Sequence, residues 1–393
     1  MNGAETIIVG GGPAGAAAAI RLAAAGRDVL LIERTTGPHH KVCGEFLSIE
    51  TQTILQRLGI DLTGQGAVPI DRVDIHAGPG SAGAALPFRA LSLSRHRLDA
   101  ALLERAAQAG AQVQRGLVVQ AIARENERWS VRCDSGEIFQ AHNLVLATGK
   151  HGVRGIEDRR DISLVGLKMH LHLGPEQRHA IARRVELFML DGAYVGIEPV
   201  EGGVANLCLV MAREKAARLG PSWPALSDHL KCAHAKLAAR IDGAEPLFEK
   251  PLAIVCPAGG HVHDETDPAA FRVGDRLAHI PPFTGDGLAI AVASGSLAAE
   301  HIMRGHSPAA YLAAAHALAA QPVHLAGMVS RLAANRAGRA LMVTAALVPG
   351  LIGAITRRTR LNRSALPIQM QGYSYASARA ETGEGISARS SAG

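Results

Sequence analysis

The chain has 393 residues, of which 48% are hydrophobic and only 3% aromatic, and its formal net charge is +6. The apolar content excludes global disorder, and the length allows two domains. The scarcity of aromatic residues argues against a surface on which nucleic-acid bases stack. The five cysteines form no CxxC pair and no export signal precedes the first apolar run, so we expect a cytoplasmic protein with reduced thiols.

The stretch from Thr6 to Arg34 has the order strand, glycine turn, helix, strand, acid. In such a unit the glycines let the backbone approach a pyrophosphate, and the N-terminus of the helix offers N–H groups to the phosphates. The acid at the end of the second strand can accept hydrogen bonds from an adenosine ribose. The stretch therefore predicts a bound dinucleotide. The residues expected to contact it are Gly10, Gly12, Pro13, Ala14, Gly15, Glu33 and Arg34.

Residues 41–48 read KVCGEFLS and precede a helix predicted over 48–58. This segment resembles the Cys-Gly motif of the geranylgeranyl reductase-like flavoproteins, which belong to the p-hydroxybenzoate hydroxylase-type superfamily of FAD-dependent oxidoreductases. In that family the loop runs beside the flavin. The resemblance implies that Cys43 and Gly44 bind the cofactor, and it makes Cys43 and Glu45 candidate catalytic residues. The alternative is a small buried cysteine in a turn.

Two further segments resemble cofactor motifs of the same family. A helix predicted from Ser94 to Gly110 carries Arg95 in its first turn, where the family has an arginine near the FAD. After a strand at 112–115 and a meander over 118–140, a separate apolar strand begins at residue 143. It ends at Thr148 and Gly149, which resemble the ATG motif that passes close to the cofactor. The Asp-Gly motif that hydroxylases use with reduced nicotinamide is replaced here by these two residues.

Alternating runs from residue 161 to 267 predict a mixed or antiparallel sheet, with helical segments over 223–241. The run that begins at Tyr194 resembles the strand that lines the substrate pocket in the superfamily, which makes Tyr194 a third candidate catalytic residue. Archaeal and plant reductases have tryptophan and phenylalanine in this strand. Gly196 and Ile197 stand there instead, and this favours the hydroxylase branch.

A second cofactor motif, VGDRLAHIPPFTGDGLAIA, begins at Val273. It resembles the second FAD signature of the family, in which a strand ends in Gly-Asp and a P-x-T-G-D-G loop precedes a helix. A single NAD-binding domain would not need a second cofactor motif so late in the chain, so the bound dinucleotide is predicted to be FAD. The helix expected over 288–303 would aim its positive end at the flavin. The residues implied to contact FAD here are Gly274, Asp275, Pro282, Gly285, Asp286, Gly287 and Leu288.

Residues 309–370 are helical in pattern, and an apolar run over 340–355 is followed by arginines. Pro349 and Gly350 interrupt the run, so it is too short to span a bilayer. Two interpretations are open: the segment 340–363 covers the substrate opening, or it contacts an anionic membrane surface. The histidine pairs of the chain lack a convincing third ligand, so no metal site is predicted.

These observations predict an α/β fold, with a Rossmann-like FAD-binding domain, an inserted β-rich substrate domain and C-terminal helices. The predicted boundaries are 1–70, 94–160 and 268–320 for the FAD-binding domain, 71–93 and 161–267 for the substrate domain, 321–372 for the helical region and 373–393 for a disordered tail.

The favoured function is an FAD-dependent monooxygenase that hydroxylates a lipophilic aromatic or polyketide-like molecule with oxygen and NADPH or NADH. One alternative is a geranylgeranyl reductase-type enzyme that reduces isoprenoid double bonds. Another is a flavin-binding scaffold or sensor without turnover. The expected partner is a lipophilic small molecule and not nucleic acid. The chain is expected to be a monomer or homodimer, in the cytoplasm or at the inner face of the membrane.

Overall fold

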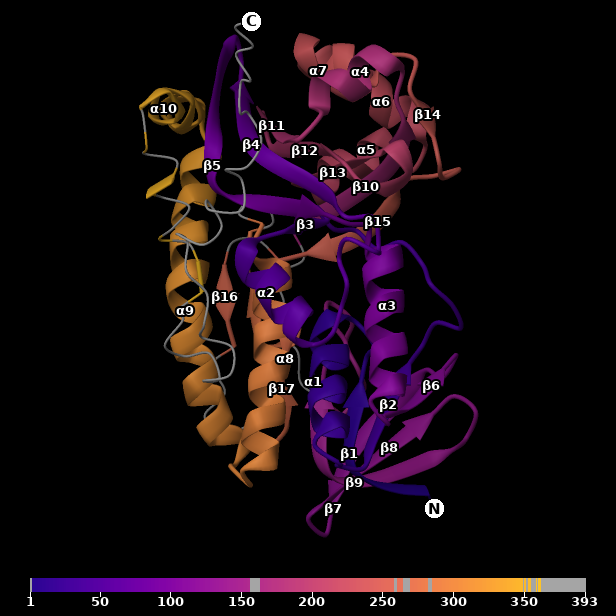
Figure 1. The fold of residues 1–393 in the computed structure, drawn as a ribbon. Coiled ribbons are helices and arrows are strands. Elements are labelled where there is room, and N and C mark those ends of the chain that lie inside the picture. The colour runs from indigo at the N-terminus through magenta and orange to yellow at the C-terminus, as the bar shows by residue number, and fades with distance from the viewer. Residues whose placement is uncertain are drawn as a thin grey trace, which may run out of the picture.

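The computed structural model describes residues 2–155, 163–257, 260–263, 269–281, 285–348, 350, 353–354, 358 and 360–361. They form two large sheets, each covered by helices, and a long helix runs along one side of the molecule (Figure 1). The predicted fold class is confirmed: a Rossmann-like α/β unit, a second β-rich unit and helices near the C-terminal end. The predicted disordered tail, 373–393, and Pro282 lie outside the described residues.

The first sheet has the strand order β6-β2-β1-β9-β8-β7, and β17 pairs with β9. Strands β6, β2, β1, β9 and β17 run parallel to one another. Strand β8 is antiparallel to both of its neighbours, β9 and β7. Residues 271–272 therefore belong to the nucleotide-binding sheet, although they follow the strands of the second sheet in the chain. The strands are β1 (Asn2–Val9), β2 (Val29–Glu33), β6 (Gln112–Arg115), β7 (Val119–Glu125), β8 (Arg128–Cys133), β9 (Ile138–Leu146) and β17 (Phe271–Arg272).

One strand of this sheet differs from the prediction. The sequence analysis separated a meander strand ending at 140 from an apolar strand beginning at 143, but β9 is continuous. The reason is its neighbour β1, which begins at Asn2 and pairs with β9 from Phe139 to Leu146. Ala141 is fully buried in the middle of β9, so nothing interrupts the strand.

Helices of small residues pack closely against the first sheet. The glycine turn leads into α1, which begins at Pro13, and most of its alanines are fully buried. A Cβ atom on Gly295 of α8 would lie 2.0 Å from the backbone oxygen of Ala14, so only glycine lets the two helices approach this closely. The helices around this sheet are α1 (Pro13–Ala24), α2 (Ile49–Arg57), α3 (Arg95–Gln108) and α8 (Gly287–Met303).

The second sheet has the order β14-β10-β13-β12-β11-β4-β5-β3, and β15 also pairs with β10. It joins strands from the two sequence regions that were assigned to a substrate domain with β3 and the start of β4, which come from the region 1–70 that was assigned to the FAD-binding domain. It is mostly antiparallel, with one parallel pair between β4 and β11. The strands are β3 (Phe46–Leu47), β4 (Val68–Ala77), β5 (Gly80–Ser92), β10 (Leu164–His172), β11 (Arg184–Leu190), β12 (Ala193–Pro199), β13 (Val204–Ala212), β14 (Glu245–Pro246) and β15 (Leu252–Cys256).

Four short helices lie near this second sheet, and some of their side chains share an apolar core with it. They are α4 (Pro175–Ile181), α5 (Arg213–Leu219), α6 (Trp223–Ala233) and α7 (Ala235–Ile241). The helical segment predicted over 223–241 is broken at His234, which has an extended backbone. The remaining short elements are η1 (Glu201–Gly203), β16 (His261–Val262), η2 (Gly274–Arg276) and β18 (Ala278–His279).

Two helices follow α8. The long α9 (Pro308–Ala333) packs beside α8, and α10 (Arg336–Leu347) packs on β4 and β5 (Figure 1). Among the described helices, α9 is the one that is long and apolar enough to cross a membrane, but 44% of its most apolar 18-residue window is buried in the molecule. A helix in the core of a soluble protein meets the same criteria of length and apolarity, so α9 is only weak evidence for a membrane span.

Candidate flavin site

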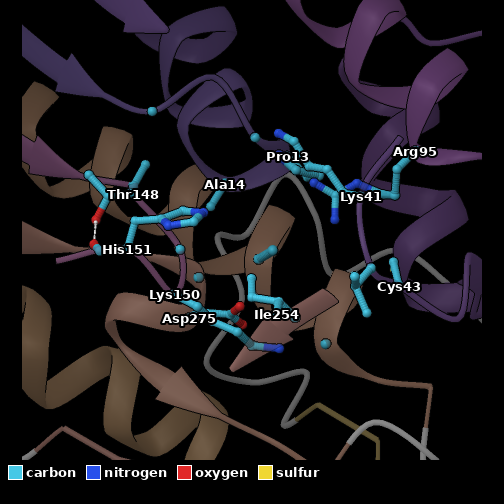
Figure 2. A pocket seen from close by; sticks show the side chains of 18 of the residues that line it. Pro13, Ala14, Lys41, Cys43, Arg95, Thr148, Lys150, His151, Ile254 and Asp275 are labelled. Atoms are coloured by element: carbon cyan, nitrogen blue, oxygen red, sulfur yellow. Dashed lines mark hydrogen bonds between the residues drawn. The ribbon is translucent and has the colours of Figure 1, made fainter. Parts of the chain in front are cut away.

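A cavity of about 510 Å³ lies between the two sheets, and the predicted cofactor residues meet there. All of them that the structure describes line the cavity, except Gly15 and Asp286. Figure 2 shows Lys41, Arg95 and Cys43 on one side of the view and Thr148 and His151 on the other. The motifs lie far apart in the chain, and the fold brings them to one place.

The glycine turn shapes one end of the cavity. Gly10 has a φ angle of 109°, and a Cβ atom there would lie 2.3 Å from the oxygen of Ala147. Gly15 packs against this turn and not against the cavity, since its Cβ atom would lie 2.0 Å from the oxygen of Gly10. Gly12 is the N-cap of α1 and has no side-chain cap. The first turn of α1 therefore faces the cavity with backbone N–H groups and no acidic residue, which fits a pyrophosphate.

Glu33, at the end of β2, is 5% exposed and lines the same end of the cavity. Its Oε2 atom accepts a hydrogen bond of 2.7 Å from the N–H of Gly11, and its Oε1 atom accepts one of 2.8 Å from the hydroxyl of Thr35. Burial opposes ionisation, but the charge of Lys41 and these hydrogen bonds outweigh it and lower the pKa of Glu33. The carboxylate is thus ionised and oriented, as an acceptor for ribose hydroxyl groups needs to be.

The Cys-Gly loop lines the cavity beside Arg95. The Cys43 sulfur accepts a hydrogen bond of 3.3 Å from the N–H of Glu45, and it lies within hydrogen-bonding reach of Arg95. Arg95 also forms two hydrogen bonds with Asp99, of 2.7 and 2.9 Å. Burial opposes the charge, but Asp99 and, next, Cys43 raise the pKa of Arg95 above its usual range. A Cβ atom on Gly44 would meet no atom within 4 Å, so this glycine leaves open space toward the cavity.

Glu45 lines the cavity and is the charged centre of a buried cluster. Its φ angle is 58°, which is rare for a residue with a side chain, and its side chain is fully buried. The carboxylate contacts the ammonium group of Lys168 and lies 2.8 Å from Nε2 of His170. Burial opposes its charge, yet Lys168 and His170 lower the pKa of Glu45. Lys168 and His170 lie two positions apart on β10, and no local pattern in the sequence identifies Glu45 as their partner.

A metal ion fits this cluster poorly. Potential ligand atoms of His40, Glu45 and His170 lie within 4.8 Å of one another. However, Lys168 already places one positive charge on the Glu45 carboxylate, and a divalent cation would be repelled by it. Burial and the neighbouring His170 and Lys168 lower the pKa of His40 to about 4, so this imidazole is neutral at neutral pH. The ammonium group of Lys168 is thus the feature that disfavours a cation here, and the absence of a metal site stays a prediction.

The opposite side of the cavity carries a lysine that the sequence analysis missed. Lys150 directly follows the predicted pair Thr148 and Gly149, and its ammonium group lies 3.5 Å from the sulfur of Cys256. Burial would lower its pKa, but the charge of Asp275 raises it. Its position next to the ATG motif was the available signal. The cation is therefore placed close to the predicted cofactor aspartate.

Besides Gly15, two predicted residues lie away from the cavity lining. Asp286 is 1% exposed and contacts Arg360 at 2.5 Å, so its carboxylate pairs with a C-terminal arginine. Tyr194 packs in an apolar cluster that includes Val73 of β4 and Met342 of α10. Burial raises the pKa of Tyr194 well above its usual value. A catalytic role for Tyr194 stays a prediction, and the structure gives it no place in the lining of this cavity.

Comparisons with known proteins agree with this site. Residues 3–155 match the family model described as an FAD binding domain. The chain is 27% identical to the menaquinone reductase of Mycolicibacterium smegmatis over 328 residues, which cover 77% of each protein. It is 26% identical to digeranylgeranylglycerophospholipid reductase 2 of Methanopyrus kandleri over 321 residues, which cover 75% of this chain and 76% of that protein.

Solved structures share the fold at low identity. The flavin-dependent brominase Bmp2 superposes with a TM-score of 0.77 over 97% of this chain and 98% of its own, at 16% identity. The probable FAD-dependent monooxygenase pqsL of Pseudomonas aeruginosa has a TM-score of 0.70 over 87% of this chain and all of its own, at 18% identity. FAD is therefore the cofactor of this protein. Residues 3–155 are thus an FAD binding domain, and the chain as a whole is similar to FAD-dependent oxidoreductases of the superfamily that contains the p-hydroxybenzoate hydroxylase-type and geranylgeranyl reductase-like flavoproteins.

Proposed function

We propose that this flavoprotein reduces a carbon–carbon double bond of a lipophilic substrate, with NADPH or NADH as the electron donor. The proposal rests on the wall of the cavity that faces the glycine motifs, which is formed by residues of the second sheet. Among its described residues, this wall has no acidic side chain and consists of glycine, thiol, aliphatic and aromatic groups. They are Phe46 on β3, Gly166 on β10, Cys208 and Val210 on β13, and Leu252, Ala253, Ile254 and Cys256 on β15. Such a wall favours an apolar group over a charged one.

The sequence relatives support reduction over hydroxylation. Relatives that align over three quarters of their length are named as reductases of menaquinone and of a digeranylgeranyl phospholipid. The monooxygenase and halogenase structures share at most 18% identity with this chain and support only the fold. We therefore prefer the reductase over the monooxygenase, although the residues of β12 favoured the monooxygenase.

The reaction needs a hydride and a proton. Bound FAD supplies a ring that accepts a hydride from the nicotinamide and donates it to one carbon of the double bond. The second carbon takes a proton, so the product gains two hydrogens. The chain offers a path for this proton, because His40 lines the cavity, stacks on His96 and lies edge-on to His170 at 4.8 Å. His170 in turn contacts Glu45, which also lines the cavity.

A monooxygenase that acts on a lipophilic aromatic or polyketide-like molecule is the second candidate. The observation that favours it lies in β12, where Gly196 and Ile197 replace the aromatic residues that reductases of archaea and plants have in this strand. In this reaction one atom of molecular oxygen would enter the substrate, and NADPH or NADH would supply the electrons for the second atom.

Product mass distinguishes the candidates. The purified flavoprotein would be incubated with NADPH or NADH and a lipophilic cell extract, once without oxygen and once under isotopically labelled oxygen. A menaquinone and a geranylgeranyl lipid would serve as defined substrates. A product that gains two hydrogens without oxygen, and keeps them after air has reoxidised any quinol to the quinone, supports the reductase, whereas one labelled oxygen atom supports the monooxygenase and overturns our proposal. If neither the nicotinamides nor chemical reduction of the flavin gives a product, the scaffold or sensor is favoured. Boiled protein is the control.

A further inference from the structure

Exposed apolar side chains are concentrated in one short part of the chain. In the part of the chain that the structure describes, nine large hydrophobic side chains are exposed, and five of them lie between residues 328 and 348. We call these five the C-terminal apolar surface. They are Met328 (50% exposed), Leu332 (37%), Leu341 (56%), Leu347 (65%) and Val348 (50%).

The helix α10 carries exposed apolar side chains in addition to its buried ones. Val343 and Ala346 are buried against β4 and β5, which is the face that a surface helix normally uses for its core contact. Leu341 and Leu347 point away from this core and are more than half exposed. The end of α9 adjoins this helix, because a Cβ atom on Gly338 would touch the side chain and backbone of Leu332. Leu341 and Leu347 are thus exposed apolar side chains of α10 for which the described residues offer no partner.

The charged residues of the segment that carries this surface have one sign, although Arg339 pairs with the exposed Asp191 and Arg360 pairs with Asp286. Residues 301–361 contain seven arginines and no lysine, aspartate or glutamate, which gives a formal charge of +7. The whole chain carries +6, so all other residues together carry −1. Arg331, Arg336 and Arg358 are exposed, and no ion pair is recorded for them within the described residues. The excess positive charge of the protein therefore lies in the segment that also carries the apolar surface.

We propose that the C-terminal apolar surface and its arginines dock the protein on an anionic lipid bilayer. Apolar side chains can enter the headgroup region, while arginines attract acidic headgroups, and the two contributions add. A second copy of the chain is a poorer occupant, because a twofold dimer through this surface would bring the exposed arginines Arg331 and Arg336 of the two copies together. The α9 helix lies along the bilayer in this arrangement and does not cross it, since Tyr311, Leu318 and Val323 are buried in the protein.

Vesicle binding tests this proposal with the full-length holoprotein. Sedimentation with vesicles of phosphatidylcholine and phosphatidylglycerol would be compared with sedimentation with phosphatidylcholine alone. We expect binding to the acidic vesicles only, and we expect salt to weaken it. The double variant Leu341→Asp/Leu347→Asp and the triple variant Arg331→Gln/Arg336→Gln/Arg358→Gln should each weaken binding about tenfold or more.

A matched control carries the same charge change on exposed apolar residues elsewhere. Ile138→Asp/Leu247→Asp alters side chains that are 37% and 38% exposed, in β9 and before β15, and should bind vesicles as the wild type does. Bound FAD absorbance would show that every variant is folded. Equal binding to neutral and acidic vesicles, or unchanged binding of both C-terminal variants, overturns the proposal. A wild-type dimer that Leu341→Asp/Leu347→Asp converts to a monomer would also overturn it, because a second copy would then cover this surface.

Discussion

The carboxylate of Glu45 and the ammonium group of Lys168 form a fully buried ion pair between residues 123 positions apart in the chain. Glu45 belongs to the loop that carries Cys43 and Gly44 along the flavin cavity, and Lys168 belongs to the second sheet. The N–H of Arg95 also donates a hydrogen bond of 2.7 Å to the Glu45 carboxylate. The pair thus attaches the cavity loop to both structural units and holds Glu45 at its positive φ angle.

Removing one partner of this pair should destabilise the protein. Glu45→Gln leaves the Lys168 charge buried without its partner, and Lys168→Met does the same to Glu45. We expect each single variant to lose about 3–5 kcal/mol of unfolding free energy, measured by urea denaturation. The double variant should lose less than the sum of the two, because it buries no lone charge. Additive losses, or single losses below about 0.5 kcal/mol, would show that the pair is not coupled.

A separate readout tests whether this cluster handles protons. If Glu45 and His170 pass a proton toward the cavity, Glu45→Gln should change the pH profile of substrate turnover after flavin reduction. Flavin reduction by the nicotinamide itself should keep its rate, because that step takes no proton from this cluster. Equal slowing of both steps at every pH would indicate a structural role only.

Gly44→Val tests the position of the flavin without disturbing the free protein. A Cβ atom on Gly44 meets nothing within 4 Å, and its φ angle is not positive, so the variant should fold normally. If the cofactor lies against this loop, the valine side chain will occupy its space, and FAD affinity should fall by about tenfold or more. Gly37→Val is the matched control, because Gly37 also has no atom within 4 Å of its Cβ position and does not line the cavity. Equal FAD affinity of both variants, by titration of flavin fluorescence, would place the cofactor elsewhere.

Cys43 should be protected from alkylation by FAD. Cys43 is partly exposed and lines the cavity, whereas Cys232 is exposed on α6, far from it in the chain and absent from the lining. We expect iodoacetamide to label both thiols in the apoprotein and only Cys232 in the holoprotein, since labelling requires access to the thiol. Peptide mass spectrometry gives the extent of labelling at each site. Equal labelling of Cys43 with and without FAD would contradict its predicted place beside the cofactor.

Features that are local in the sequence were predicted well. The glycine motif and Glu33 lie within one βαβ unit, so spacing alone indicated their geometry. The helix predicted over 48–58 is confirmed as α2, and the hydroxyl of Ser48 at its start accepts a hydrogen bond from the N–H of Thr51. The helix that begins after Ser94 is also confirmed. In each case the residues that determine the structure lie within a few positions of one another.

Features that depend on distant residues were not predicted. No local pattern joins Glu45 to Lys168, or Asp286 to Arg360, because each pair forms only when separate elements have packed. Pairing with β1 likewise made β9 one strand where the local pattern had indicated two. The exposure of Leu341 and Leu347 on α10 was also not predictable, because it depends on Val343 packing against β4 and β5.

Glu186 makes the stability of the second sheet dependent on pH. Its carboxylate is fully buried, accepts hydrogen bonds of 2.7 and 3.1 Å from Arg240, and lies 3.4 Å from Nε2 of His76. Burial opposes its ionisation, but His76 and Arg240 lower the pKa of Glu186 to about 2. Because the folded pKa is below the unfolded value, the ionised group stabilises the protein above about pH 4.5, and this contribution is lost as the pH falls toward 2.

Glu186→Gln should therefore lower stability at pH 7 by roughly 3 kcal/mol, and this difference from the wild type should shrink between pH 5 and pH 3. Urea denaturation at each pH measures it. Asp242→Asn is the control, because Asp242 pairs with Lys231 at 2.8 Å on the surface, where solvent screens the pair, and its loss should change stability little at any pH. A difference for Glu186→Gln that stays constant from pH 7 to pH 3 would show that loss of packing, and not loss of the charge, weakens the variant.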